Sequence, residues 1–295
     1  MYNTHGITPE TLNYKTYQDL SMCIKKNLYK LPKNVDLIVG IPRSGMIPAT
    51  MLSMILSRPL CTLREFVSGD CKSTFTKRIK FSNDIKSVLI VDDSISSGKT
   101  MFGVKELIKT FDLENRYTIT YMVIYYKTQD YSKFVDIALQ KVDCPRLFQW
   151  NYLNHLFLQD AAFDLDGVLC QNPTKEENND SDKYHEFILN AKPLFIPQYK
   201  IPYIITSRLS KYESETREWL NKNNVLFDNL IMLSGYTAEQ RRNLGLHAVF
   251  KAEQYGKLDD IQLFIESDRK QAKCISKLTG KLCFCVETDE LFGKK

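Results

Sequence analysis

The stretch at residues 88–100 constrains the fold of this chain most strongly, because its polarity changes abruptly along its length. It begins Val-Leu-Ile-Val, and four apolar, mostly β-branched residues predict a short buried strand. Polar residues start at Asp92, and the serines, glycine and threonine that follow offer backbone amides and hydroxyl groups to an anion. Residues 100–108 predict a helix whose positive N-terminal end faces that anion. This strand, loop and helix together predict a phosphate-binding site.

The acidic pair Asp92 and Asp93 distinguishes this loop from a P-loop. A P-loop requires a glycine five positions before Gly98, and Asp93 occupies that position. Two adjacent carboxylates repel a phosphate, so we expect them to face another group of the same ligand, for which a ribose diol is well suited. The alternative is a plain turn between a core strand and a helix, in which both aspartates act as caps.

The ordered pattern of apolar strand, Asp-Asp, hydroxyl residues, glycine and threonine resembles the 5-phosphoribosyl-1-pyrophosphate (PRPP) signature of the type I phosphoribosyltransferases. This resemblance implies that the acidic pair holds the 2- and 3-hydroxyls of the ribose and that the loop holds its 5-phosphate. The PRPP-binding residues expected in this stretch are Asp92, Asp93, Ser94, Ser96, Ser97, Gly98, Lys99 and Thr100.

Two further segments fit this interpretation. A predicted strand at residues 36–41 runs into a Gly-Pro turn, which resembles the family's pyrophosphate loop and adds Arg43 and Ser44 to the expected PRPP site. Residues 64–82 are polar and lack periodicity, so we expect a mobile loop that closes over PRPP. Basic residues in this loop would neutralise pyrophosphate or simply face solvent: Lys72, Lys77, Arg78 and Lys80.

The arrangement of predicted elements indicates an α/β fold with two domains. Strands predicted at residues 118–126 and 136–142 alternate with helices, which indicates a mostly parallel sheet flanked by helices. We place the domains at residues 1–155 and 156–295, and interpret the aromatic-rich run at residues 148–157 as their junction rather than as a platform for an acceptor.

Charge and cysteine content narrow the class of protein. The formal net charge of +5 is small and scattered, so it suits anionic small substrates rather than nucleic acid. Eight cysteines show no metal-type spacing, and we expect most to be small core residues. We see no signal peptide and no apolar run of the ~20 residues that a membrane helix needs, so we expect a cytoplasmic protein without an integral membrane segment. The sequence leaves oligomerisation open.

A second pair of aspartates follows the apolar run at residues 161–163. Asp164 and Asp166 are one residue apart at a strand end, so they project to the same side, and Gly167 permits a sharp turn. The pattern resembles motif I of the haloacid dehalogenase (HAD) phosphatases. This resemblance implies that Asp164 attacks phosphorus to form an aspartyl-phosphate and that Asp166 protonates the leaving oxygen. Because a carboxylate that attacks an anionic phosphate needs charge neutralisation, Mg²⁺ is the expected cofactor.

The remaining HAD motifs follow in the family's order. The resemblance implies that Thr206 binds phosphate and that Lys251 is the motif III lysine, with Lys257 as the alternative. Residues 171–202 are too short and too polar for a sizeable cap domain, so we expect a HAD-like fold with an open site. The expected Mg²⁺ ligands are Asp164, Asp166, Glu266 and Asp268, and the sequence does not decide which of the last two is closer.

The two sites together predict a bifunctional enzyme that installs ribofuranose. The first domain would transfer 5-phosphoribose from PRPP to a glycan, such as a lipid-linked polysaccharide, and the second would remove the 5-phosphate. This arrangement resembles bacterial two-domain systems for polysaccharide biosynthesis that pair a glycan phosphoribosyltransferase with a phosphoribosyl phosphatase. The alternatives are a nucleobase salvage transferase with an accessory nucleotide phosphatase and a regulatory PRPP-binding protein. The intact acidic residues of both sites argue against the regulatory role.

Overall fold

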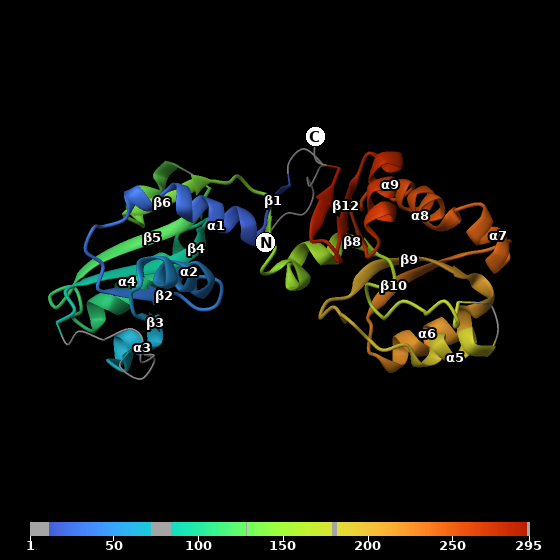
Figure 1. Ribbon diagram of the computed structural model, residues 1–295, viewed down its shortest axis with the longest axis horizontal. Coiled ribbons are helices and arrows are strands. Elements are labelled where there is room, and N and C mark those ends of the chain that lie inside the picture. The colour runs from blue at the N-terminus through green and yellow to red at the C-terminus, as the bar shows by residue number, and fades with distance from the viewer. Residues whose placement is uncertain (1–11, 72–83, 128, 179–181, 294–295) are drawn as a thin grey trace. The chain divides into compact units, whose positions relative to one another are not determined.

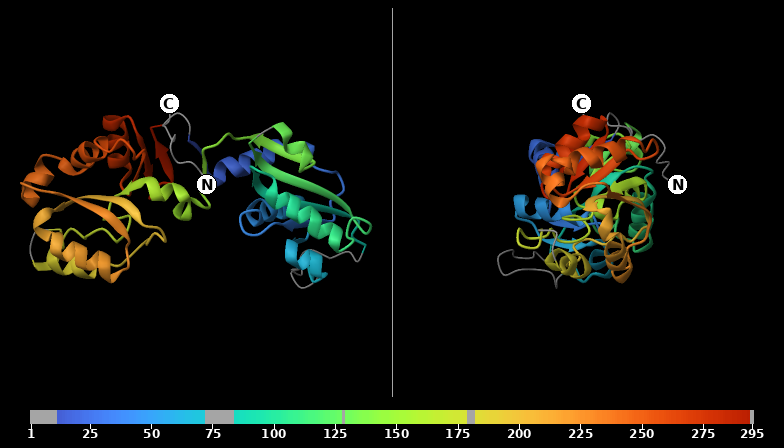
Figure 2. Two further views of the ribbon diagram at one scale, coloured as in Figure 1. Left: turned by 180° about the vertical axis from the view of Figure 1, so that it is seen from behind. Right: turned by 90° about the vertical axis from the view of Figure 1, so that its right-hand side faces the viewer.

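A computed structural model describes residues 12–71, 84–127, 129–178 and 182–293 (Figure 1). The chain divides into two compact units, one of residues 15–150 and one that combines residues 1–14 with residues 151–295. Each unit contains a mostly parallel sheet with helices beside it, so the predicted α/β class is confirmed (Figure 2). In the described parts of the chain, no helix is both long enough and apolar enough to span a membrane.

The unit of residues 15–150 contains a five-stranded parallel sheet in the order β3-β2-β4-β5-β6. The chain leaves β2 for β3 on one side and returns to β4 on the other side, so the strand order reverses between β2 and β4. Ligands of open α/β sheets bind at such a reversal, beyond the carboxyl ends of the strands. The strands are β2 (Leu37–Gly40), β3 (Leu60–Thr62), β4 (Ser87–Ile95), β5 (Thr118–Tyr126) and β6 (Ile137–Lys141).

Helices cover both faces of this sheet, which explains the unbroken apolar run at the start of β4. Val88 and Ile90 pack with residues of α3 and α4 on one face, while Leu89 and Val91 pack with residues of α1 and α2 on the other. All four side chains are fully buried. The helices are α1 (Tyr17–Lys26), α2 (Met46–Leu56), α3 (Leu63–Ser68) and α4 (Lys99–Thr110). Strands β1 (Asn13–Lys15) and β7 (Arg146–Phe148) form a separate two-stranded sheet.

The second unit contains a six-stranded sheet in the order β10-β9-β8-β11-β12-β13, parallel except for β13. The chain moves outward from the central β8 through β9 to β10 and then returns to β11, so this strand order reverses between β8 and β11. The strands are β8 (Ala161–Phe163), β9 (Ile201–Leu209), β10 (Phe227–Leu233), β11 (Leu263–Glu266), β12 (Leu282–Cys285) and β13 (Glu290–Phe292).

Helices of the second unit follow four of its strands. Between β8 and β9 the structure describes one helix, α5, which packs against α6. The helices are α5 (Asp182–Asn190), α6 (Glu213–Lys222), α7 (Ala238–Asn243), α8 (Leu246–Gly256) and α9 (Arg269–Thr279).

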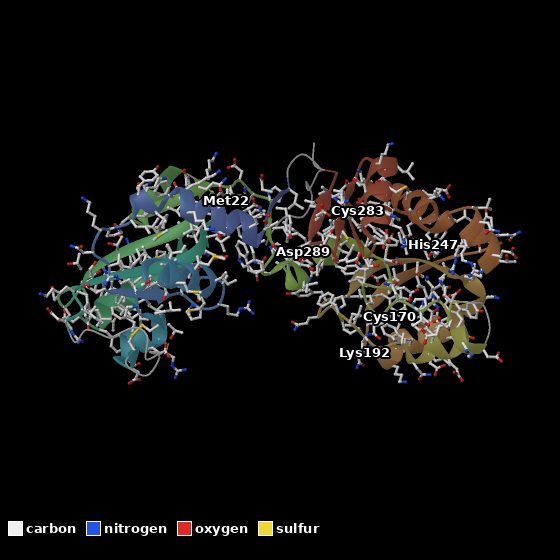
Figure 3. The ribbon with its side chains drawn as sticks, in the orientation of Figure 1. Met22, Cys170, Lys192, His247, Cys283 and Asp289 are labelled. Carbon is white, nitrogen blue, oxygen red and sulfur yellow. A yellow bond between two sulfur atoms is a disulfide. The ribbon has the colours of Figure 1, made fainter. Side chains whose placement is uncertain are left out.

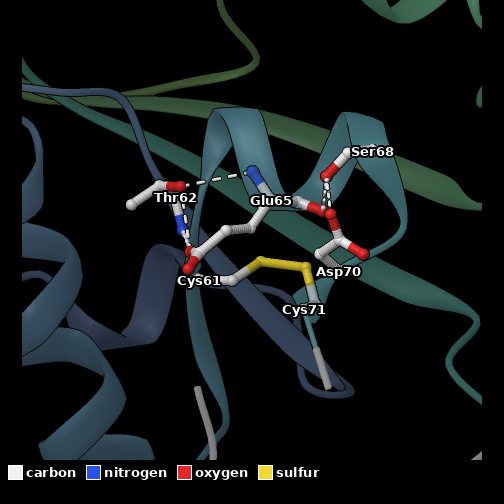
Figure 4. Close-up of a disulfide and its surroundings, with 6 residues drawn as sticks. All are labelled: Cys61, Thr62, Glu65, Ser68, Asp70 and Cys71. Carbon is white, nitrogen blue, oxygen red and sulfur yellow. Dashed lines mark hydrogen bonds between the residues drawn. A yellow bond between two sulfur atoms is a disulfide. The ribbon is translucent and has the colours of Figure 1, made fainter. Parts of the chain in front are cut away.

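The cysteines and a short helix bear on two expectations from the sequence analysis. Buried free cysteines such as Cys170 and Cys283 fit the expected role as core residues (Figure 3). Cys61 and Cys71, however, form a disulfide that spans α3 (Figure 4). The prediction of an irregular loop from residue 64 is wrong at its start, because Thr62 and Glu65 form a capping box and start this helix. The predicted loop cations lie outside the described residues: Lys72, Lys77, Arg78 and Lys80.

Candidate active sites

The acidic pair of the first unit lies near the carboxyl end of β4, next to the point where the strand order reverses. Asp92 and Asp93 are 8% and 4% exposed, so both carboxyl groups are largely removed from water. Burial and then the neighbouring charge of Asp93 raise the pKa of Asp92 to about 8. The predicted pair is therefore a buried acidic centre and not a solvent-exposed helix cap.

Neutral donors orient the Asp93 carboxylate from both sides. The hydroxyl of Ser44 donates a 3.0 Å hydrogen bond to Oδ1, and the indole N–H of Trp150 donates a 2.7 Å hydrogen bond to Oδ2. The backbone N–H of Asp93 donates to Oδ1 of Asp92 at 2.9 Å. The structure thus brings the expected pyrophosphate loop and the expected diol-binding pair together.

The loop at residues 42–45 approaches β4 so closely that only glycine fits at position 45. A Cβ atom on Gly45 would lie 2.8 Å from Oδ1 of Asp92 and 2.6 Å from the carbonyl oxygen of Ile41. Arg43 is exposed and lies in the turn that leads into α2, as expected for a group that meets a ligand. This close approach sets the spacing between the expected pyrophosphate loop at residues 42–45 and the acidic pair on β4.

The expected phosphate loop follows the same strand. Ser96 and Ser97 are exposed, and Gly98 begins α4 with a φ of 77°, a conformation that favours glycine. No side chain in the described part of the chain caps this helix end, so its first amides stay available to a ligand. Lys99 and Thr100 are exposed in the first turn, and Ser94 is half-buried in β4. The loop residues thus gather around one helix end.

Trp150 is a site residue that the sequence analysis missed. The two units do divide directly after Trp150, within the run that we interpreted as a junction, but Trp150 itself also bonds to Asp93. Its ring stacks on Phe148 at a centroid distance of 4.7 Å, and Phe148 stacks on Tyr125. The only hint in the sequence that Trp150 belongs to the site was the general need of a tryptophan N–H group for a hydrogen-bond acceptor.

In the second unit, Lys251 joins two strand ends. Its ammonium group lies 2.7 Å from Oδ2 of Asp164, after β8, and 2.7 Å from Oε2 of Glu266, at the end of β11. All three side chains are at least 94% buried. Lys257 caps the far end of α8 and is exposed, so Lys251 is the lysine that the structure places beside the aspartate.

Charge and burial act against each other in this cluster. Burial raises the pKa of Asp164 to about 8, while the adjacent Lys251 opposes that shift. Burial alone would lower the pKa of Lys251, but Asp164 and Glu266 raise it above its usual range. The lysine therefore stays charged and limits the rise in the pKa of Asp164, the carboxyl group that the HAD resemblance assigns as nucleophile.

Asp166 is held by a buried arginine that the sequence analysis did not single out. The Arg208 guanidinium, which is fully buried, donates hydrogen bonds of 3.1 Å and 3.2 Å from Nε and 2.6 Å from an Nη atom to the Asp166 carboxylate. Thr206 is 1% exposed, and its hydroxyl accepts the backbone N–H of Arg208 at 3.3 Å. Its neighbour Ser207 lines the cavity beside Asp164.

The acidic groups of the second unit do not fit a metal ion in this arrangement. Glu266 accepts hydrogen bonds from the backbone N–H groups of Ser267 and Asp268 as well as from Lys251. Asp268 is exposed and caps α9 through the backbone N–H of Gln271. Within the described residues, no group of three or more His, Cys, Asp or Glu side chains is placed to hold a metal. The Mg²⁺ site therefore stays a prediction from the sequence.

A cavity of roughly 270 Å³ opens beside Asp164. The polar residues that line it are Asp164, Asp166, Asn172, Asn178, Tyr184, Ser207, Arg241, His247, Lys251, Ser267, Asp268 and Gln271. The cavity and the buried nucleophile candidate together resemble a site for a small polar substrate.

Comparison with known proteins gives a family match for the first unit. The family model for the phosphoribosyl transferase domain matches residues 13–152. A purine phosphoribosyltransferase from Pyrococcus horikoshii Ot3 is 26% identical with a TM-score of 0.36, over 48% of this chain and 94% of that chain. The Helicobacter pylori xanthine-guanine-hypoxanthine phosphoribosyltransferase is 16% identical with a TM-score of 0.37, over 48% and 93% of the two chains. No curated protein matches this chain.

The family match covers all of the elements that form the acidic centre. It includes the loop with Ser44, strand β4 with Asp92 and Asp93, the start of α4 and the donor Trp150. The type I phosphoribosyltransferase resemblance of the first half is thereby confirmed. Residues 13–152 form a phosphoribosyl transferase domain.

Proposed function

We propose that this chain installs ribofuranose on a glycan in two steps. The transferase domain replaces the pyrophosphate of PRPP with an acceptor hydroxyl at the anomeric carbon, and the hydroxyl loses its proton. The unit of residues 151–295 then hydrolyses the 5-phosphate of the product. The observation that carries the proposal is the pairing of a buried aspartate, Asp164, with Lys251 beside a polar cavity, in the same chain as a transferase domain.

The contacts in the second unit support a covalent mechanism. An Asp164 oxygen would bond to phosphorus while the bond from phosphorus to the ribose oxygen breaks, and Asp166 would give that oxygen a proton. Water would then attack the aspartyl-phosphate and release phosphate, while Asp166 recovers its proton from the water. Lys251 and Arg208 hold the two carboxylates in place during both steps.

A nucleobase acceptor fits the transferase domain about equally well. The contacts of Asp92, Asp93 and the phosphate loop concern the ribose and its phosphate, and none of them selects an acceptor. The presence of a second acidic site is the feature that favours the glycan, because removal of the 5-phosphate turns a nucleotide into a less useful nucleoside.

An acceptor panel tests this choice directly. The protein would be incubated with PRPP, Mg²⁺ and either nucleobases or oligosaccharides, and the products would be analysed by mass spectrometry. We expect an oligosaccharide that gains unphosphorylated ribose, with an inverted anomeric centre in the NMR spectrum. Transfer to nucleobases with refusal of every saccharide would contradict the glycan proposal and establish the salvage alternative. Release of phosphorylated product alone would contradict the hydrolytic step.

A further inference from the structure

A second buried cation lines the cavity beside Asp164. Among the described residues that form this cavity, the cationic side chains are Lys251 and Arg241. Arg241 lies in α7, which comes after β9 with the expected motif II and before α8 with Lys251, and it is only 3% exposed. No expected HAD motif includes it, so its position needs its own explanation.

Within the described residues, the hydrogen-bond partners of Arg241 are all neutral, unlike those of Lys251 and Arg208. Its Nη atoms donate to the backbone carbonyl of Ser207 at 2.8 Å and to the amide oxygen of Asn178 at 3.1 Å. Its Nε atom is buried and has no hydrogen-bond acceptor in the described part of the chain. Lys251 and Arg208 each contact carboxylates at 2.6–2.7 Å.

The polar groups beside Arg241 do not supply the missing negative charge. His247 bonds to the hydroxyl of Ser207 at 2.9 Å, and burial together with Arg241 and Lys251 lowers its pKa to about 4. The imidazole is therefore neutral at pH 7 and carries no charge into the cavity. A buried guanidinium without an anionic partner is costly, because its desolvation is not compensated.

The charge arrangement indicates what the missing partner is. Asp164 and Glu266 share Lys251, and Asp166 occupies Arg208, so these two cations are already committed to carboxylates. Because Asp164, Asp166 and Asp268 line the cavity, a phosphate that enters it would meet three acidic side chains. Among the described cationic groups there, only Arg241 lacks a carboxylate partner. Arginine suits this role because its planar fork binds two phosphate oxygens at once.

We propose that Arg241 binds the phosphate group that reacts at Asp164, and so determines the affinity of this cavity for phosphomonoesters. The inference rests on the proposed hydrolytic function for its substrate, but binding of inorganic phosphate tests it without turnover. Ser207 and Asn178 position the guanidinium through the two hydrogen bonds already described.

The adjacent arginine provides a matched control. Arg242 lies in the same helix and donates to the backbone carbonyl of Asn178 at 2.9 Å, but its side chain is exposed and does not line the cavity. Calorimetry with inorganic phosphate would compare the full-length wild type, Arg241→Gln and Arg242→Gln. Phosphate bound at residues 96–100 contributes equally to all three proteins, so their difference reports the cavity.

We expect Arg241→Gln to weaken phosphate binding in the cavity about ten- to hundredfold and Arg242→Gln to leave it unchanged. Arg241→Lys keeps the charge but loses the fork, so we expect an intermediate loss; this variant also serves if Arg241→Gln fails to fold by circular dichroism. Hydrolysis of ribose 5-phosphate should show a raised KM in both Arg241 variants.

The outcomes separate this inference from the proposed function. Arg241-dependent phosphate binding without hydrolysis by the wild type would support the anion site and contradict the phosphatase. Hydrolysis with the same KM in wild type and both Arg241 variants would overturn the inference and leave the phosphatase intact. Weaker binding of ribose 5-phosphate with unchanged binding of inorganic phosphate would also overturn it, because Arg241 would then recognise another part of the substrate.

Discussion

The acidic residues of the transferase domain accept hydrogen bonds from neutral groups, whereas those of the second unit contact buried cations. Asp93 is held by Ser44 and Trp150, and burial raises the pKa of Asp92. Asp164 and Asp166 are instead paired with Lys251 and Arg208. Neutral donors leave negative charge for the hydroxyls of a sugar, which gain charge-assisted hydrogen bonds. Cations cancel the charge, which lets an anionic phosphate approach a carboxylate.

The largest effect expected from this comparison is at the proposed nucleophile. Asp164→Asn should reduce phosphomonoester hydrolysis by roughly 10³-fold or more, because an amide does not form the acyl phosphate. With the correct acceptor, this variant should accumulate product that carries ribose 5-phosphate, one phosphate heavier than the wild-type product by mass spectrometry. Transfer from PRPP should be unchanged, which serves as the internal control. Hydrolysis at the wild-type rate would show that Asp164 has another role.

Removal of the shared cation should be the next largest effect. Lys251→Met leaves Asp164 and Glu266 buried without their partner, so we expect the free energy of unfolding of the second unit to fall by about 3–5 kcal/mol. Lys257→Met, at an exposed position beyond α8, is the matched control and should change stability little. Urea unfolding measures the free energy of unfolding of both variants. Equal stability of the two variants would mean that the ion pairs of Lys251 contribute nothing net.

Changing both carboxylates of the transferase domain tests the other side of the comparison. The double variant Asp92→Asn with Asp93→Asn should lose hydrogen bonds to the ribose diol, and each charge-assisted bond lost should cost about 1.5–3 kcal/mol, or roughly ten- to a hundredfold in PRPP affinity per bond. Calorimetry with PRPP measures this loss, and unchanged hydrolysis by the second unit is the control. PRPP binding at wild-type strength would rule out the diol assignment.

Local patterns predicted the fold well where one strand or helix determined the outcome. The apolar run at residues 88–91 predicted a strand buried on both faces, and β4 has that environment. Helix α3 was missed although Thr62 and Glu65 have the spacing of a capping box, because the polar residues that follow suggested a loop. The contact of Trp150 with Asp93 joins residues 57 positions apart, and no local pattern encodes a pairing of that length.

In the second unit too, contacts between residues far apart in the sequence could not be predicted from local patterns. The order of the motifs led to Asp164 and Lys251, which the structure brings within hydrogen-bond distance. Arg208 follows Thr206 and Ser207 directly, yet the sequence does not show that its partner is Asp166, 42 positions away. Arg241 carries no motif at all, and its importance depends on the burial and on the neutral partners that tertiary structure provides. Sequence spacing is therefore least able to predict which charged side chains pair inside the fold.

The smallest effect concerns how pH acts on the two kinds of acidic centre. The pKa of Asp92 is raised to about 8 in the folded chain, against about 3.9 for an unfolded aspartate. Between these values the folded state binds more protons than the unfolded state, so the free energy of unfolding should decrease as pH rises from about 4 to about 8. Asp92→Asn cannot ionise and should remove this decrease. Its stability relative to wild type should therefore be greater at pH 8 than at pH 5, by at least ~1.4 kcal/mol, the equivalent of one pKa unit.

Asp166→Asn is the contrasting variant for that measurement, because it removes the partner of the buried Arg208. It should lower the free energy of unfolding of its own unit at both pH values, since an uncompensated guanidinium remains in the core. Urea unfolding of both variants at pH 5 and pH 8 gives the four free energies of unfolding that this comparison needs. If Asp92→Asn has the same relative stability at both pH values, its carboxyl group is already ionised at pH 5. Asp92 and Asp93 would then both be charged without a cationic partner among the described residues. In that case the ligand, and not protonation of Asp92, would have to compensate the charge of this pair.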